Sequence, residues 1–185
     1  LPTTAGYYYL TKDVNLNSRF AEIKNDDVFL CLNGMTVTAR AEGTDGKTNI
    51  FRLTGSGSLT ICDCDKNAGT LTGASMGAIF TMASATGTVN IYDGIFENNT
   101  TNDSGAVVVL QNTTQLYIYG GEFKNNTATN NGGVVYVGGN SAATISGGKA
   151  GSGSNYGGNS MLTLNQATSS LTVTDLILDG GYEAS

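Results

Sequence analysis

Cysteine is the side chain of this sequence with the most reactive chemistry, and it occurs three times, as Cys31, Cys62 and Cys64. Because three is an odd number, at least one thiol stays unpaired whichever disulfide forms. A structural zinc site takes four ligands, and the chain has no histidine that would supply the fourth. The cysteines therefore leave two interpretations open, a disulfide or neighbouring free thiols.

Histidine is absent from all 185 residues, and so is tryptophan. This excludes catalysis by a histidine acid or base, histidine metal sites and nucleophilic triads that contain histidine. A polysaccharide lyase would instead need a calcium-binding carboxylate cluster and a basic group. The only arginines, Arg19, Arg40 and Arg52, all lie in the first third of the chain.

Oxygen ligands alternate in one short segment, at Asp63, Asp65 and Asn67. Their spacing is that of the opening of a calcium-binding loop. The sixth position is Ala68 instead of glycine, and the twelfth is Ala74 instead of glutamate. A turn stabilised by Asp and Asn side chains explains the same residues, so we expect no cofactor and keep calcium as the weaker alternative.

Charge and hydropathy exclude two classes of partner. The formal net charge is −6, and the nine basic residues are scattered, which leaves no cationic stripe for nucleic acid. No stretch approaches the roughly 20 consecutive apolar residues of a membrane span. Glycan or protein is therefore the expected partner.

A repeat must position these candidate residues. The segment GTVNIYDGIFENNT, from Gly87, recurs as TQLYIYGGEFKNNT from Thr114 and as SAATISGGKAGSGS from Ser141, each 27 residues further on. Looser copies start at Asp27, Gly57 and Ser169. Residues 27–185 thus divide into repeats of about 27–31 residues, and residues 1–26 are left as an N-terminal rung or cap.

Within a copy, apolar and polar residues alternate, as in a strand with one buried face. Val89 and Ile91 align with Leu116 and Ile118, while Asn90 falls between. Gly, Thr, Asn and Ser together supply 84 residues and disfavour helices. One copy cannot bury its apolar face alone, but stacked copies about 4.8 Å apart can. We therefore predict an all-β, single-stranded parallel β-helix, a solenoid of about six rungs, forming a single domain.

The alignment places Cys31 and Cys62 in the same column of neighbouring rungs, within the distance that a disulfide spans. This makes Cys31–Cys62 the candidate disulfide and leaves Cys64 unpaired. A Cys62–Cys64 bond is less favourable, because alternate residues of a strand lie about 6.5–7 Å apart.

Four tyrosines fall at outward positions of two strand columns, namely Tyr92, Tyr117, Tyr119 and Tyr136. Flat aromatic rings on a rigid sheet suit stacking against sugar rings. A stacked ladder of strand-forming aromatic residues explains them equally well without a ligand. They are the candidate ligand-binding residues.

A further column of aliphatic residues arises in the strand that precedes each copy. If Phe51, Phe80, Val108, Val135 and Leu162 point inward, the residue before each of them points outward. These preceding residues are Ile50, Ile79, Val107, Val134 and Met161. An exposed aliphatic row of this kind predicts a surface for a partner protein.

Several segments carry a resemblance to a known class of protein. They are Tyr8-Tyr9-Leu10-Thr11, residues 28–34, residues 59–64 and the repeats of the form G-x-F-x-N-N-T. The chain resembles the right-handed β-helix regions of large adhesin-like surface proteins from Gram-positive gut bacteria. The last motif is also similar to repeats of polymorphic outer-membrane adhesins, in architecture only. The resemblance implies a right-handed coil and an extracellular setting, secreted or on the bacterial cell surface.

The function expected from these observations is that of a non-enzymatic extracellular module, a rigid stalk or adhesin that binds glycan or protein through its lateral face. The alternative is a carbohydrate-active enzyme, similar to the polysaccharide lyases built on the same scaffold. The sequence ends near Gly180-Gly181-Tyr182 without a polar cap, so we expect a fragment of a longer surface protein.

Overall fold

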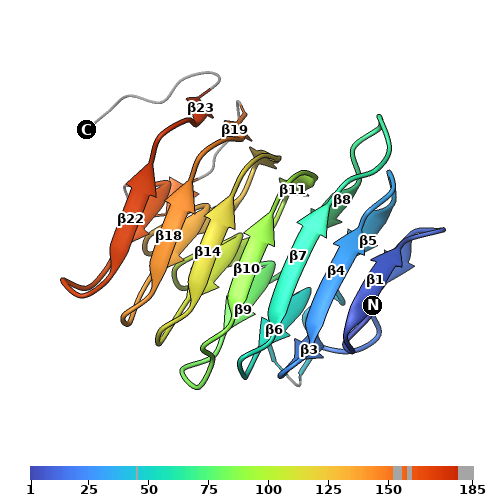
Figure 1. Ribbon diagram of the computed structural model, residues 1–185, viewed down its shortest axis with the longest axis horizontal. Coiled ribbons are helices and arrows are strands. Elements are labelled where there is room, and N and C mark those ends of the chain that lie inside the picture. The colour runs from blue at the N-terminus through green and yellow to red at the C-terminus, as the bar shows by residue number, and fades with distance from the viewer. Residues whose placement is uncertain (45, 152–155, 158–159, 179–185) are drawn as a thin grey trace.

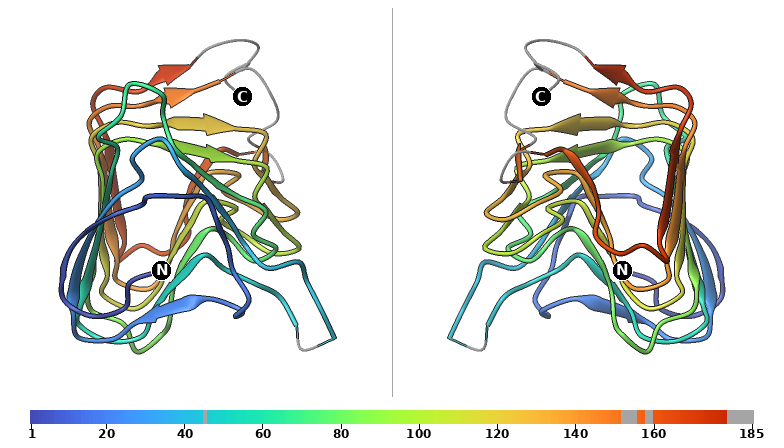
Figure 2. Two further views of the ribbon diagram at one scale, coloured as in Figure 1. Left: turned by 90° about the vertical axis from the view of Figure 1, so that its right-hand side faces the viewer. Right: turned by 90° about the vertical axis from the view of Figure 1, so that its left-hand side faces the viewer.

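The computed structural model of the chain is a parallel β-solenoid of about six turns, as predicted. It describes residues 1–44, 46–151, 156–157 and 160–178. Figure 1 shows the turns side by side from the N-terminal to the C-terminal end, and Figure 2 shows them superimposed around a common interior. Residues 152–154, which end one of the repeat copies, and 180–182, where a cap was sought, lie outside the described residues.

Three long parallel sheets form the walls of the solenoid. The first sheet contains β1 (Gly6–Tyr9), β4 (Asp27–Cys31), β7 (Ser58–Cys62), β10 (Thr88–Ile91), β14 (Gln115–Ile118), β18 (Ala142–Ile145) and β22 (Ser170–Val173). The second contains β2 (Val14–Asn15), β5 (Thr36–Thr38), β8 (Thr70–Thr72), β11 (Ile95–Glu97), β15 (Glu122–Lys124), β19 (Lys149–Ala150) and β23 (Ile177–Leu178).

The third sheet contains β3 (Ala21–Ile23), β6 (Phe51–Leu53), β9 (Ile79–Thr81), β13 (Val108–Leu110), β17 (Val135–Val137) and β21 (Leu162–Leu164). A short extra sheet is formed by β12 (Thr100–Thr101), β16 (Thr127–Ala128) and β20 (Tyr156–Gly157). No helix among the described residues is long and apolar enough to cross a membrane.

The first sheet follows the predicted register. Val89 of β10 pairs with Leu59 on one side and with Leu116 on the other, and all three are fully buried. The residues between them face outward, so the strands alternate as the sequence indicates. Stacking the copies thus gives a continuous apolar interior and pairs each strand with its neighbours.

The turns of the solenoid depend on asparagine and glycine. Asn98 and Asn125 adopt φ angles of 53° and 50°, a left-handed conformation that asparagine tolerates better than most residues. The next residues, Asn99 and Asn126, are fully buried and hydrogen-bond along the axis, with 3.2 Å between Asn99 Nδ2 and Asn126 Oδ1. The predicted asparagine ladder is therefore present between these two rungs.

Gly87 lies where two rungs approach most closely. A Cβ atom added there would stand 1.8 Å from the carbonyl oxygen of Gly57, which belongs to the backbone and cannot rotate away. We expect Gly87→Ala to lower the free energy of unfolding by about 1–3 kcal/mol, because the rungs must separate.

The matched control for this change is Gly151→Ala. Its added Cβ would meet only the flexible side chain of Lys124, at 3.4 Å. Urea unfolding of both variants, followed by circular dichroism, should show a loss for Gly87→Ala and a change within about 0.5 kcal/mol for Gly151→Ala. Equal stability of the two variants would contradict the close approach of Gly57 and Gly87.

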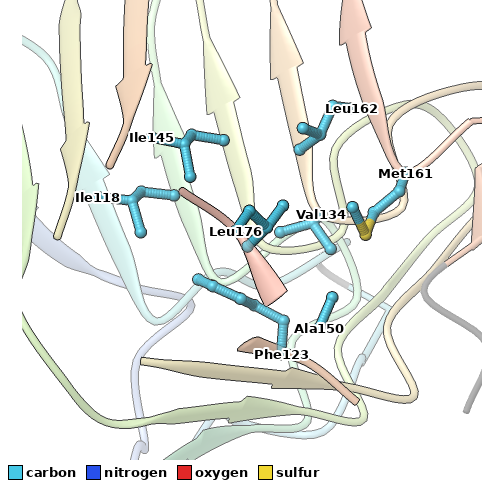
Figure 3. Close-up of a pocket in the computed structure, with 8 residues that line it drawn as sticks. All are labelled: Ile118, Phe123, Val134, Ile145, Ala150, Met161, Leu162 and Leu176. Carbon is cyan, nitrogen blue, oxygen red and sulfur yellow. The ribbon is translucent and has the colours of Figure 1, made fainter. Parts of the chain in front are cut away.

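The expected outward aliphatic column is wrong. Ile50, Ile79, Val107 and Val134 are at most 2% exposed, and Met161 is half-buried against the core. Figure 3 shows Val134 and Met161 in the interior, beside a small apolar cavity that is also lined by Ile118, Phe123, Ile145, Ala150, Leu162 and Leu176. These residues are therefore core residues, and they form no partner surface.

Two features of the third sheet explain the error. The carbonyl oxygen of Ala78 accepts hydrogen bonds from the N–H groups of both Ile50 and Phe51, at 2.9 and 3.0 Å. Two consecutive N–H groups aimed at one oxygen mark a bend, which turns both side chains inward. In addition, Phe51 pairs with Ile79 and not with Phe80.

Candidate ligand-binding groove

The outer face of the first sheet carries two columns of side chains. One column runs through Tyr7, Phe29, Thr60, Asn90 and Tyr117. The other runs through Tyr9, Cys31, Cys62, Tyr92 and Tyr119. Aromatic rings thus occupy the first two rungs and the fourth and fifth, while the third rung between them presents the smaller Thr60 and Cys62.

The aromatic side chains stack along the solenoid axis. The ring centroids of Tyr7 and Phe29 lie 4.5 Å apart, and those of Tyr92 and Tyr119 lie 4.6 Å apart. Tyr117 lies 6.3 Å from Tyr119 across the same face. Parallel stacking at one rung of separation leaves one face or edge of each ladder open to solvent, and Tyr7 and Tyr92 remain 84% and 51% exposed.

The smaller side chains of the third rung form the floor of a groove between the two groups of rings. Its volume is about 530 Å³, within the usual range for ligand sites. The lining residues are Tyr7, Tyr8, Tyr9, Phe29, Cys31, Thr60, Cys62, Cys64 and Tyr92. This lining is largely apolar and contains no lysine, arginine or carboxylate side chain.

The sequence-based tyrosine set divides between two places. Tyr92 lines the groove, and Tyr117 and Tyr119 continue the same face beyond it. Tyr136 instead lies on the third sheet, opposite Val109, in a separate pocket of about 210 Å³. Burial raises the pKa of Tyr136, and Asp103 adds to the rise.

Sequence reasoning missed Tyr7, Tyr9 and Phe29 as parts of this face. Tyr8 pairs with Leu30, only 22 residues later, so the first rung does not follow the 27-residue period. The available signal was the run Tyr7-Tyr8-Tyr9, in which the outer two residues alternate with an inner one.

The candidate disulfide is also corrected. Cys31 and Cys62 are rung neighbours as predicted, but the disulfide joins Cys31 to Cys64, and Cys62 is free. The chain leaves β7 at Cys62 and turns, which brings the Cα of Cys64 to 6.0 Å from that of Cys31. That separation suits a disulfide, whereas the alternation rule used for straight strands does not apply beyond the strand end.

Cys62 retains a thiol in a partly buried position. Burial raises its pKa, and the negative charges of Asp63 and Asp93 raise it further. Its Sγ contacts the carbonyl oxygen of Leu30 at 3.7 Å, with the thiol as donor. The neutral thiol is therefore the favoured form at neutral pH.

The proposed calcium ligands are engaged with the backbone. Asp63 Oδ1 accepts hydrogen bonds from the N–H groups of Gly34 and Asp65, at 3.1 and 3.0 Å, and its Oδ2 accepts one from Gly69. Asp65 Oδ1 accepts a bond of 2.8 Å from the N–H of Asn67. These contacts account for the acidic spacing as a turn that closes around Asp63, and calcium binding here stays a prediction.

Comparison with known proteins gives no match: no family model, no curated protein and no solved structure matches this chain.

Proposed function

We propose that this chain is a non-enzymatic extracellular module of a bacterial surface protein, a rigid stalk or adhesin domain, which binds glycan in the groove of the first sheet. The observation that carries this proposal is the groove itself. Aromatic rings stand at both of its ends, and its floor is low and neutral.

The chemistry of the lining favours sugar over other ligands. The C–H faces of a sugar ring pack against aromatic rings, while tyrosine hydroxyls meet its polar edges. The groove runs along the stack from the first rung to the fourth, which is about 14 Å at one rung per ~4.8 Å. That length accommodates a short oligosaccharide lying along the axis.

The same lining argues against acid/base catalysis in the groove. A lyase or hydrolase needs a positioned proton donor or acceptor, normally a carboxylate, histidine or lysine. None of these types lines the groove. The disulfide between Cys31 and Cys64 supports an oxidising, extracellular setting.

We expect the double change Tyr9→Ala, Tyr92→Ala to weaken binding to the best ligand of a glycan array at least tenfold, or about 1.4 kcal/mol. The reason is that each ring supplies an exposed face to the groove and little to the core. Isothermal titration calorimetry with that ligand would measure the loss.

The control is Tyr136→Ala, which removes a tyrosine from the third sheet and leaves the groove intact. It should bind the glycan as the unchanged protein does. Equal loss in both variants would contradict the groove as the site. Release of reducing sugars or unsaturated products from a polysaccharide would replace the proposal with the enzyme alternative.

A further inference from the structure

The floor of the groove holds three sulfur atoms in one place. The Sγ atoms of Cys31, Cys62 and Cys64 all lie within 4.8 Å of one another. Two of them share the disulfide, and the third is a thiol. In the part of the chain that the structure describes, these sulfurs are the one group of three such side chains close enough to share a metal ion.

Backbone elements hold the three positions independently of the disulfide. Cys31 and Cys62 are paired residues of the parallel strands β4 and β7. Cys64 follows after a turn whose shape is set by Asp63, because its carboxylate accepts backbone hydrogen bonds from Gly34, Asp65 and Gly69. The cluster is therefore a product of the register and the turn, and it persists when the disulfide opens.

We propose that, when a dithiol reductant opens the Cys31–Cys64 disulfide, the three sulfurs form a trigonal thiolate site for one soft cation, Cu(I). In the first step the disulfide takes two electrons and two protons from the dithiol, which becomes a disulfide itself. In the second step Cu(I) displaces the protons of the three thiols and forms three Cu–S bonds. Oxidation to the Cys31–Cys64 disulfide removes two ligands and closes the site.

The distances fit this coordination. A thiolate–metal bond of about 2.3 Å places the three sulfurs of a trigonal site about 4.0 Å apart. The observed separations reach at most 4.8 Å, so small χ1 rotations of the freed side chains suffice. Cys31 is buried, Cys62 is half-buried and Cys64 is exposed, which gives a site with one open side for entry of the ion.

The ligand set selects the ion. Thiolates are soft ligands, and Cu(I) prefers them and accepts three of them. Zinc requires a fourth ligand, the chain has no histidine, and both oxygens of nearby Asp63 are already bonded to the backbone. Calcium requires oxygen ligands. The site is thus distinct in ligand chemistry from the glycan groove above it, although they share the same floor.

The test uses the full chain, reduced with dithiothreitol and desalted without oxygen. Cu(I), supplied as its acetonitrile complex, is titrated in competition with bicinchoninate, whose colour reports free Cu(I). The reduced protein should bind one equivalent, and Cys62→Ser should weaken binding at least a hundredfold. Thr60→Ser, beside the cluster, should bind as the unchanged protein does, and the oxidised protein should bind at least a hundredfold more weakly.

Circular dichroism establishes that the reduced protein and Cys62→Ser keep the solenoid, and Cys64→Ser provides a second ligand deletion. An equimolar amount of Zn²⁺ should leave Cu(I) in place. The proposal is overturned if the reduced, folded protein binds no Cu(I), if both serine variants bind it as tightly as the unchanged protein, or if Zn²⁺ displaces it.

Discussion

Phe123→Ala should lower the free energy of unfolding by about 3–5 kcal/mol, through lost burial and the cavity left behind. Phe123 is 1% exposed, and its ring stacks on that of Phe96 with 5.4 Å between centroids. Its other neighbour along the column is the small Ala150. The ring also forms one wall of the cavity in Figure 3, so its removal enlarges an existing void.

Calorimetry should show this loss as a decrease in Tm of roughly 6–20 °C for a chain of this size. The matched control is Tyr119→Ala, which removes a ring that is 45% exposed on the outer face. That change should cost about 1 kcal/mol or less. If the two variants melt together, Phe123 does not lie in the core position that the register assigns to it.

Asn99→Leu should cost about 2–4 kcal/mol, although leucine has nearly the same size and is more apolar. The Asn99 side chain accepts a hydrogen bond from the N–H of Ala74 and donates to the carbonyl oxygen of Leu71, both at 3.1 Å. It also donates to Asn126 Oδ1. Leucine makes none of these bonds, so buried polar groups lose their partners.

The same substitution at Asn90 is the control. Asn90 lies on the outer face, where its Nδ2 donates to Thr60 Oγ1 at 3.3 Å and solvent can replace that bond. Asn90→Leu should change stability by about 0.5 kcal/mol or less. Urea unfolding of both variants measures the difference, and a stable Asn99→Leu protein would show that the ladder contributes little.

The sequence was sufficient to predict the solenoid and the register of its first sheet. Repeats such as those beginning at Gly87 and Thr114 have a constant period, and alternation identifies the buried residues between turns. Phe96 and Phe123 stack as this register requires. Each of these features depends on local pattern alone, which a single sequence contains. The right-handed sense of the coil stays a prediction.

Predictions failed where the chain departs from straight strands. The bend at Ile50 and Phe51 turns consecutive side chains inward, and alternation cannot anticipate this. The turn after Cys62 brings Cys64 to Cys31, because its path is set by the hydrogen bonds of Asp63. The groove was found in part only, since Tyr7 and Tyr9 lie in a rung of irregular length.

The most direct test of glycan binding in the groove observes the tyrosine rings themselves. The chain contains nine tyrosines and no tryptophan, so labelling with 3-fluorotyrosine gives a ¹⁹F NMR spectrum in which each ring can be assigned by substitution. Addition of the best ligand from the glycan array should shift the signals of Tyr7, Tyr9 and Tyr92 and leave that of Tyr136 in place. A shift confined to Tyr136, or no shift while binding is measured by calorimetry, would contradict the groove as the site of glycan binding.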